Sequence, residues 1–341
     1  MKEFYINSCI DDKRLYCVDF AENLKNPKMI VQICHGMTEH IRRYKDFALF
    51  LEKQGIRAFG MDNRGHGKTC EEEELRGHIA DTEGDIKLIE DVYTLNKYIR
   101  AEFPDKKVVI FGHSMGSLIV RNFLNEYSEC VDGAVICGTT EPYGIKHRIS
   151  MLLAKLFSAK NGSKKSEFVN RLGFKGYNSR IKNRNSDFDW LTSDENEVEK
   201  YILDKDCGYL CTNMFFLDLL TLIKEASYKM NIVNIRKDLP ILFIAGKEDP
   251  VGAYGKGVLK TYKIYKKVGI KNLKIKLYGK MRHEVLNEIG KEKVYLDIYN
   301  FLENVNENNK KETKLEIVTP LKRAEINSVN ADPNFQQFPK L

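Results

Sequence analysis

Short apolar runs alternate with amphipathic segments along most of this chain, and this alternation constrains its fold more than any other feature. Residues 29–34 and 108–111 are nearly continuous apolar runs of strand length, which is typical of strands covered on both faces. Residues 44–53, 81–103 and 115–127 carry apolar side chains at helical spacing. Strands that alternate with helices favour an α/β fold, a mostly parallel, doubly wound sheet with helices on both faces.

The same reasoning extends to the rest of the chain. Further strands are expected at residues 4–6, 15–18, 56–61, 133–139, 241–244 and 273–278, and further helices at 253–267 and 284–302. Between residues 141 and 230 the alternation is interrupted by helices and loops, which predicts a helical cap inserted after the sixth strand. We therefore expect a core made of residues 1–140 and 231–304, a cap at 141–230, and a polar, flexible C-terminal tail at 305–341.

The segment Gly112-His113-Ser114-Met115-Gly116 lies between an expected buried strand and an expected helix. This is the context of a nucleophile elbow, in which a sharp strand-to-helix turn exposes a serine hydroxyl. The turn also brings the serine to a helix N-terminus, where backbone N–H groups favour developing negative charge. The pattern predicts Ser114 as a nucleophile in an α/β-hydrolase fold; the alternative is a glycine-rich turn without chemistry.

A serine nucleophile needs a base and an acid, which follow it in this fold in the order Asp or Glu, then His. Only His147 and His283 follow Ser114, and His147 falls in the expected cap. His283 directly follows the last expected strand, at the sheet edge where ligand sites of open α/β sheets collect. We therefore predict His283 as the base. Asp249, in the turn after the strand at 241–244, is the predicted acid, with Glu248 as the alternative.

Acyl transfer also needs two N–H donors directed at the oxygen of the tetrahedral intermediate. One should be the backbone N–H of Met115, the residue after the nucleophile. The other should come from the loop after the strand at 29–34, and Met37 is the expected donor. Substrate contacts are left open, although residues 141–230 of the cap are expected to supply them.

Several motifs of this chain resemble those of one hydrolase group. They are His35-Gly36-Met37-Thr38-Glu39-His40 with Arg43-Tyr44, Asp62-Asn63-Arg64-Gly65-His66-Gly67, Gly112–Ser117, Gly246–Gly252 and Arg282–Glu288. In this order they resemble the monoacylglycerol lipase and lysophospholipase group, the serine aminopeptidase-like α/β-hydrolases. The resemblance implies ester hydrolysis of a lipid-like substrate through an acyl-enzyme, without metal or cofactor. We expect Asp62, Arg64 and His66 to be structural, and Glu39 and His40 to shape the oxyanion loop.

Basic charge is concentrated in the expected cap. Residues 146–186 contain eleven lysine or arginine residues and one acidic residue, a net charge of +10, whereas the rest of the chain carries −3. Apolar side chains lie between Lys146 and Lys160, a combination that suits peripheral contact with an anionic membrane. The alternative is a solvated basic cap whose apolar face covers the active site. Nucleic acid is not expected as a partner, because no recognition motif is present.

The chain shows no secretory signal and no apolar run long enough to span a membrane, and its eight cysteines follow no disulfide or zinc pattern. We therefore expect a cytoplasmic protein, peripheral to the membrane at most. Two other functions stay open. One is a peptidase or amidase on the same scaffold, and the other is a non-catalytic, hydrolase-fold protein that binds a ligand.

Overall fold

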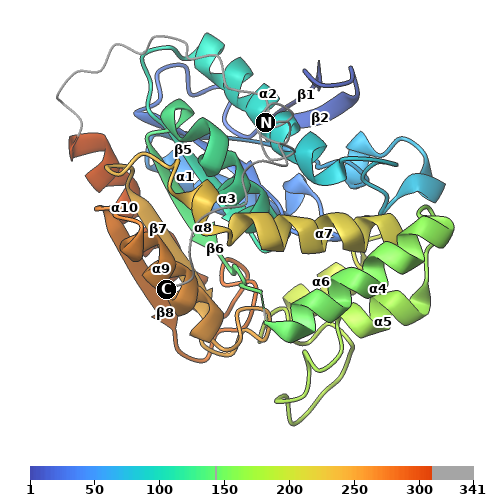
Figure 1. The fold of residues 1–341 in the computed structure, drawn as a ribbon. Coiled ribbons are helices and arrows are strands. Elements are labelled where there is room, and N and C mark those ends of the chain that lie inside the picture. The colour runs from blue at the N-terminus through green and yellow to red at the C-terminus, as the bar shows by residue number, and fades with distance from the viewer. Residues whose placement is uncertain (143, 309–341) are drawn as a thin grey trace, which may run out of the picture. The chain divides into compact units, whose positions relative to one another are not determined.

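The structure, a computed structural model, describes residues 1–142 and 144–308. Its centre is an eight-stranded sheet (Figure 1). The strands are β1 (Lys2–Asn7), β2 (Arg14–Asp19), β3 (Met29–Cys34), β4 (Ile56–Met61), β5 (Val108–His113), β6 (Gly133–Cys137), β7 (Ile241–Gly246) and β8 (Leu273–Tyr278). They are arranged in the order β1-β2-β4-β3-β5-β6-β7-β8, and β2 alone among them runs against the others.

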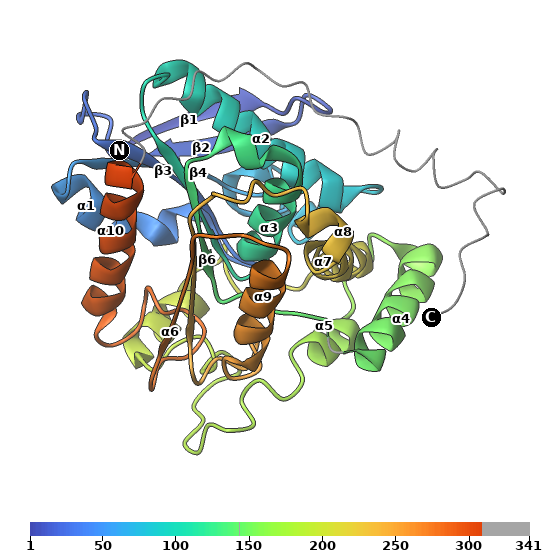
Figure 2. The same ribbon diagram turned by 60° about the vertical axis from the view of Figure 1, so that its left-hand side comes forward.

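Helices cover both faces of this sheet (Figure 2). One face carries α1 (Lys45–Lys53) and α10 (Lys291–Asn308). The other face carries α2 (Gly84–Glu102), α3 (Met115–Tyr127) and α9 (Lys256–Lys267). Side chains of β5 alternate between the two layers, so that Ile110 packs with α2 and α3 while Phe111 packs with α1 and α10. Because both faces are covered, the central strands are buried and mostly apolar, as the sequence predicts.

The segment between β6 and β7 forms helices and adds no strand to the sheet. These helices are α4 (Ile145–Asn161), α5 (Glu167–Gly173), α6 (Glu195–Leu203), α7 (Asn213–Ala226) and α8 (Lys229–Ile232). The insertion after the sixth strand is therefore confirmed. Phe215 and Leu222 of α7 pack into the same apolar cluster as α3, so the insertion lies over the helix that follows β5. Across residues 1–142 and 144–308, no helix combines the length and apolar character needed to cross a membrane.

The C-terminal helix differs from its prediction at both ends. α10 begins at Lys291 instead of near residue 284, because residues 284–290 form a loop that pairs with the segment between α5 and α6. The Glu284 N–H donates to the Leu191 carbonyl at 2.6 Å, and Gly290 has a φ of +83° just before the helix. α10 extends to Asn308, so residues 305–308, expected in the tail, are helical. The rest of that tail lies outside the described residues.

The other predicted elements agree with the structure to within three residues at each end. Within the described ranges the fold also contains four short 3₁₀ helices: η1 (Ile41–Tyr44), η2 (Gly67–Thr69), η3 (Glu73–Leu75) and η4 (Ser128–Cys130). Of these, η1 matters most here, because it joins the loop after β3 to α1. The carboxyl ends of the parallel strands β3, β5, β7 and β8 lead into the loops that carry the predicted catalytic residues.

Candidate active site

Ser114 stands between β5 and α3 in a strained backbone conformation. Its φ is +53° and its ψ is −119°, a region that costs an L-residue about 1–3 kcal/mol. The Ser114 N–H donates to the Cys137 carbonyl of β6 at 3.0 Å, which holds the turn. The flanking glycines allow close packing: a Cβ on Gly116 would lie 2.2 Å from the Cys34 carbonyl oxygen, and one on Gly112 would lie 2.5 Å from the Gly116 oxygen.

The predicted base and acid lie side by side. His283, in the loop after β8, and Asp249, in the loop after β7, are both buried, and His283 Nδ1 lies 3.0 Å from Asp249 Oδ1 in an ion-pair contact. Asp249 Oδ1 also accepts a hydrogen bond from the Val251 N–H at 2.8 Å. The alternative acid, Glu248, has an exposed side chain. Of the two carboxylates, the structure therefore brings Asp249 to the imidazole.

Two imidazoles lie close together here, with ring centroids of His113 and His283 4.7 Å apart. Burial opposes protonation of His283, yet the carboxylates of Asp249, Glu284 and Glu39 together outweigh it and raise the pKa of His283 above its ordinary value. Burial and the neighbouring His283 lower the pKa of His113 to about 3, so His113 stays neutral. The Trp190 ring packs 5.2 Å from that of His283. His283 is thus the imidazole that is equipped to take up a proton.

Ser114 and His283 line one cavity of about 100 Å³, together with Met37 and Met115. The Met115 N–H belongs to the first turn of α3, where helix N–H groups have no intrahelical acceptor. Within residues 1–142 and 144–308, neither the Met37 nor the Met115 N–H donates to another residue. His147 does not line this cavity and lies instead on α4. With Asp249 in contact with His283, the structure thus brings the predicted site residues together.

The loop that carries Met37 is held from two sides. On the core side, Glu39 Oε1 accepts a hydrogen bond from the Gly36 N–H at 2.6 Å. On the cap side, the Tyr201 hydroxyl of α6 donates to the Thr38 carbonyl at 2.9 Å. Thr38 has a φ of +50°, which turns the chain sharply after Met37. This agrees with the expectation that Glu39 shapes the oxyanion loop.

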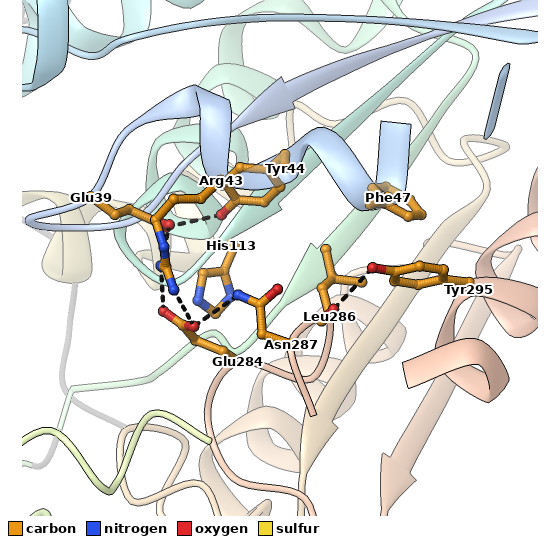
Figure 3. Close-up of a pocket in the computed structure, with 9 residues that line it drawn as sticks. All are labelled: Glu39, Arg43, Tyr44, Phe47, His113, Glu284, Leu286, Asn287 and Tyr295. Carbon is orange, nitrogen blue, oxygen red and sulfur yellow. Dashed lines mark hydrogen bonds and ion pairs between the residues drawn. The ribbon is translucent and has the colours of Figure 1, made fainter. Parts of the chain in front are cut away.

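A buried polar cluster lies beside His113 (Figure 3). Arg43 Nη1 donates to Glu39 Oε2 at 2.8 Å and to Glu284 Oε1 at 2.7 Å, and Nη2 donates to Glu284 Oε2 at 2.7 Å. Asn287 Nδ2 donates to the same carboxylate at 2.9 Å. The sequence motifs contain Arg43 and Glu284, but they do not predict that the two side chains meet. Nothing in the local pattern indicates a contact between residues 241 positions apart.

The loop after β4 makes contacts that suit a structural role. Asp62 Oδ1 accepts from the Ile41 N–H at 2.8 Å, which ties this loop to η1. Arg64 pairs with the buried carboxylate of Asp91 at 2.5 Å. The His66 ring packs among aromatic rings, and burial lowers its pKa to about 4. None of these three side chains lines the cavity that contains Ser114.

One group of three metal-ligand side chains comes together within the described residues. These are His40, Asp204 and Cys207, whose ligand atoms lie within 4.8 Å of one another. His40 Nε2 and Asp204 Oδ2 form a hydrogen bond at 2.8 Å. This contact joins the end of the oxyanion loop to the segment after α6, another link between core and cap.

Comparison with known proteins places the chain in a family. Residues 25–290 match the family described as serine aminopeptidase, S33. The chain belongs to the S33 family. Among curated proteins it is similar to a monoacylglycerol lipase of Mycolicibacterium smegmatis, with 31% identity over 110 residues, or 31% of this chain and 37% of that protein. The chain thus spans little more than a third of the length of the curated relatives that it matches first.

Solved structures resemble this S33 family member over most of their length. A thermostable carboxyl esterase from Bacillus coagulans, crystallised with glycerol, has a TM-score of 0.81 and 25% identity, covering 89% of this chain and 98% of that one. A lipase in an open form has a TM-score of 0.79 and 26% identity, covering 90% and 99%. The predicted α/β-hydrolase fold is therefore confirmed.

The cap of this S33 protein divides the space above Ser114. A second cavity of about 630 Å³ lies within the cap and shares a wall with the cavity at Ser114. That wall consists of four aromatic side chains, those of Phe174, Tyr177, Phe188 and Trp190. The Trp190 ring, besides its contact with His283, packs 4.9 Å from that of Tyr177. Because this wall is built from side chains far apart in the cap sequence, no motif predicted it.

Proposed function

We propose that this chain is a serine hydrolase that cleaves a carboxylic ester of a lipid-like substrate, a monoacylglycerol or a lysophospholipid. The observation that carries the proposal is the 3.0 Å contact between His283 Nδ1 and Asp249 Oδ1, in a cavity that His283 shares with the strained Ser114. His283 Nε2 has no hydrogen-bond partner in the described part of the chain, so it is free to accept a proton. Similarity to a monoacylglycerol lipase and a carboxyl esterase supports ester chemistry.

The reaction follows from these groups. Ser114 Oγ attacks the ester carbonyl while His283 Nε2 takes its proton, and the Asp249 carboxylate stabilises the imidazolium that forms. The N–H groups of Met37 and Met115 stabilise the negative oxygen of the tetrahedral intermediate. The imidazolium then gives its proton to the leaving alcohol, and an acyl-enzyme remains on Ser114. Water then attacks the acyl carbonyl while His283 Nε2 takes its proton, and the imidazolium returns that proton to Ser114 Oγ as the acyl–oxygen bond breaks, which releases the acid and restores the serine.

The charges in the cavity favour an ester over a peptide with a free N-terminus. An aminopeptidase needs an acidic group that is available to bind the substrate ammonium. Glu39 and Glu284 are the acidic residues in the lining of the Ser114 cavity, and both already pair with Arg43. Since both carboxylates are buried and engaged by Arg43, neither is presented to a substrate ammonium, and an uncharged ester fits this lining better.

The two cavities suit a substrate longer than a simple ester. The space at Ser114, about 100 Å³, is smaller than the 300–1,000 Å³ or so of typical ligand pockets. The adjoining cavity of about 630 Å³ lies behind the aromatic wall. We infer that a lipid-like substrate places its ester at Ser114 and extends past Trp190 and Tyr177 into the cap.

Active-site labelling tests the proposal, since an activated serine reacts with a fluorophosphonate probe. The native protein should label and should hydrolyse members of a panel of acyl esters, monoacylglycerols and lysophospholipids, whereas Ser114→Ala should do neither. His283→Ala should lose activity while His147→Ala, the other histidine after Ser114, should keep it. Labelling that persists in Ser114→Ala would contradict the proposal. So would hydrolysis of the panel by the native protein at a rate no higher than that of Ser114→Ala.

We further propose that α4 docks on an anionic membrane. Ile145, Ile149, Leu152 and Leu156 follow one another at helical spacing and are between 53% and 74% exposed, so this apolar stripe does not cover the active site. The opposite side of α4 is the buried one, with Ala154 facing inward. Lysine and arginine side chains flank the stripe, which is the arrangement of a helix that lies in a membrane interface.

Vesicle co-sedimentation tests this docking. The protein should bind vesicles that contain an anionic phospholipid more tightly than purely zwitterionic ones, because the basic residues at 146–186 attract the negative surface. Leu152→Ser with Leu156→Ser should weaken binding, whereas Leu296→Ser, an equally exposed leucine on α10, should not. Equal binding to anionic and zwitterionic vesicles, unchanged by the α4 substitutions, would refute the proposal.

A further inference from the structure

The guanidinium of Arg43 lies between two loops that the proposed reaction needs at the same time (Figure 3). Arg43 belongs to η1, just after the loop that carries Met37, whereas Glu284 directly follows His283. Its two contacts with Glu284, both at 2.7 Å, form a bidentate pair, the strongest geometry for an arginine and a carboxylate. The third contact, at 2.8 Å, reaches Glu39.

Each carboxylate in turn holds backbone at its own end. Glu39 accepts from the Gly36 N–H at 2.6 Å, one residue before the expected oxyanion donor. Glu284 is held by Asn287 at 2.9 Å, and its own N–H donates to the Leu191 carbonyl at 2.6 Å. A shift of the guanidinium would therefore move the loops on both sides. The chain of contacts runs without a break from Gly36 to the residue beside His283.

Stability alone is a weak reason for such a cluster. An arginine side chain that is only 11% exposed, together with two buried carboxylates, costs desolvation that apolar side chains of the same volume would avoid. What the charged cluster adds is geometric specificity, because the planar fork of a guanidinium donates its hydrogen bonds in fixed directions. Arg57 and Asp19 form another buried pair, but they lie at the opposite, amino end of β4.

We propose that Arg43 is a positioning residue that couples the oxyanion loop to the histidine loop, so that the two reach their reactive geometry together. This inference rests on the proposed function. Arg43 does not touch the reacting atoms in this scheme, and it acts through Glu39 on Gly36 and through Glu284 on His283.

The cluster also adds charge around the predicted base. The carboxylates that act on His283 come from three loops and are Asp249, Glu284 and Glu39. His113, at the end of β5, packs against the His283 ring, and Arg43 of η1 acts on His113. After Asp249, the carboxylates of Glu284 and Glu39 also help to raise the pKa of His283. Replacing one of them by a neutral amide should therefore lower that pKa.

Two variants separate positioning from structure. Arg43→Lys keeps the charge but cannot form the bidentate pair, so we expect kcat to fall roughly 10- to 100-fold while KM changes less than about threefold. Its pH profile should stay in place. Glu284→Gln should move the acidic limb of the kcat/KM profile to lower pH, because the Glu284 carboxylate helps to raise the pKa of His283. Arg57→Lys is the matched control for loss of a buried arginine fork and should leave kcat and the pH profile unchanged.

The outcomes are distinguishable from a failure of the proposed function. If Ser114→Ala abolishes hydrolysis but Arg43→Lys keeps native kcat, or if Glu284→Gln leaves the acidic limb in place, the coupling is wrong and the hydrolase remains. If Arg43→Lys lowers the melting temperature as much as Arg57→Lys does, and lowers kcat no further than Arg57→Lys, the arginine is only structural. If Ser114→Ala keeps native activity, the proposed function itself fails.

Discussion

Replacing Asp249 by asparagine tests the proposed mechanism at its most specific contact. Asp249 Oδ1 and His283 Nδ1 lie 3.0 Å apart with both side chains fully buried, so solvent screens the pair little. At an effective dielectric constant of about 20, opposite unit charges at this distance attract by about 5 kcal/mol. This attraction exists only when the imidazole is protonated, as it is in the transition state.

Losing it should therefore slow acylation. About 1.4 kcal/mol corresponds to a tenfold change in rate, so about 5 kcal/mol predicts a fall in kcat of roughly 10³- to 10⁴-fold for Asp249→Asn. Part of the loss comes from the tautomer, because an asparagine amide can donate to Nδ1 and so leave the proton on Nε2, where the serine proton must go. KM should change little, since Asp249 does not line the Ser114 cavity.

The assay is steady-state hydrolysis of a chromogenic acyl ester, with thermal unfolding measured on the same samples. Glu248→Gln is the matched control, because it removes the neighbouring exposed carboxylate and should keep kcat within about twofold of the native value. A loss below tenfold in well-folded Asp249→Asn would refute the reasoning. Equal losses in the two variants would refute it too.

Three further predictions concern pH and stability. The Asp249 carboxylate helps to raise the pKa of His283 above 6.5 despite burial, and the base must be neutral to accept a proton. We therefore expect kcat/KM to fall as the pH drops through a midpoint above 6.5. A midpoint well below that value would contradict the assignment. Ser114→Gly should raise the free energy of unfolding by about 1 kcal/mol in a denaturant titration, because glycine adopts a φ of +53° without strain, and a clear loss of stability would argue against a strained elbow. Gly116→Ala should lower the free energy of unfolding by about 3 kcal/mol or more, since the added Cβ would lie 2.2 Å from the Cys34 carbonyl oxygen. A melting temperature equal to the native one would contradict this and show that α3 can move away.

Local patterns were enough to predict much of this molecule. The strands of the core are apolar because helices cover both faces, so their positions could be predicted from composition over five or six residues at a time. The elbow at Ser114 combines a strand, a tight turn and a helix in adjacent residues, which is again a local signal. Asp249 and His283 could be predicted because parallel strands end at the same edge of the sheet, where residues that follow them gather.

Contacts between distant segments could not be predicted in this way. The start of α10 was placed too early because its helical spacing continues into residues that instead pair with the cap. The outward direction of the apolar stripe on α4 depends on which face packs on α7, and the sequence of α4 alone fits either direction.

The proposed catalytic residues thus follow from local pattern and chain order. Their surroundings do not: the bridge from Glu39 through Arg43 to Glu284, and the packing of Trp190 against His283, join residues that lie far apart along the chain. Which partners a buried charge or an aromatic ring meets depends on how the loops and the cap pack together. Folding brings these pairs within contact distance, and no pattern within either segment carries that information.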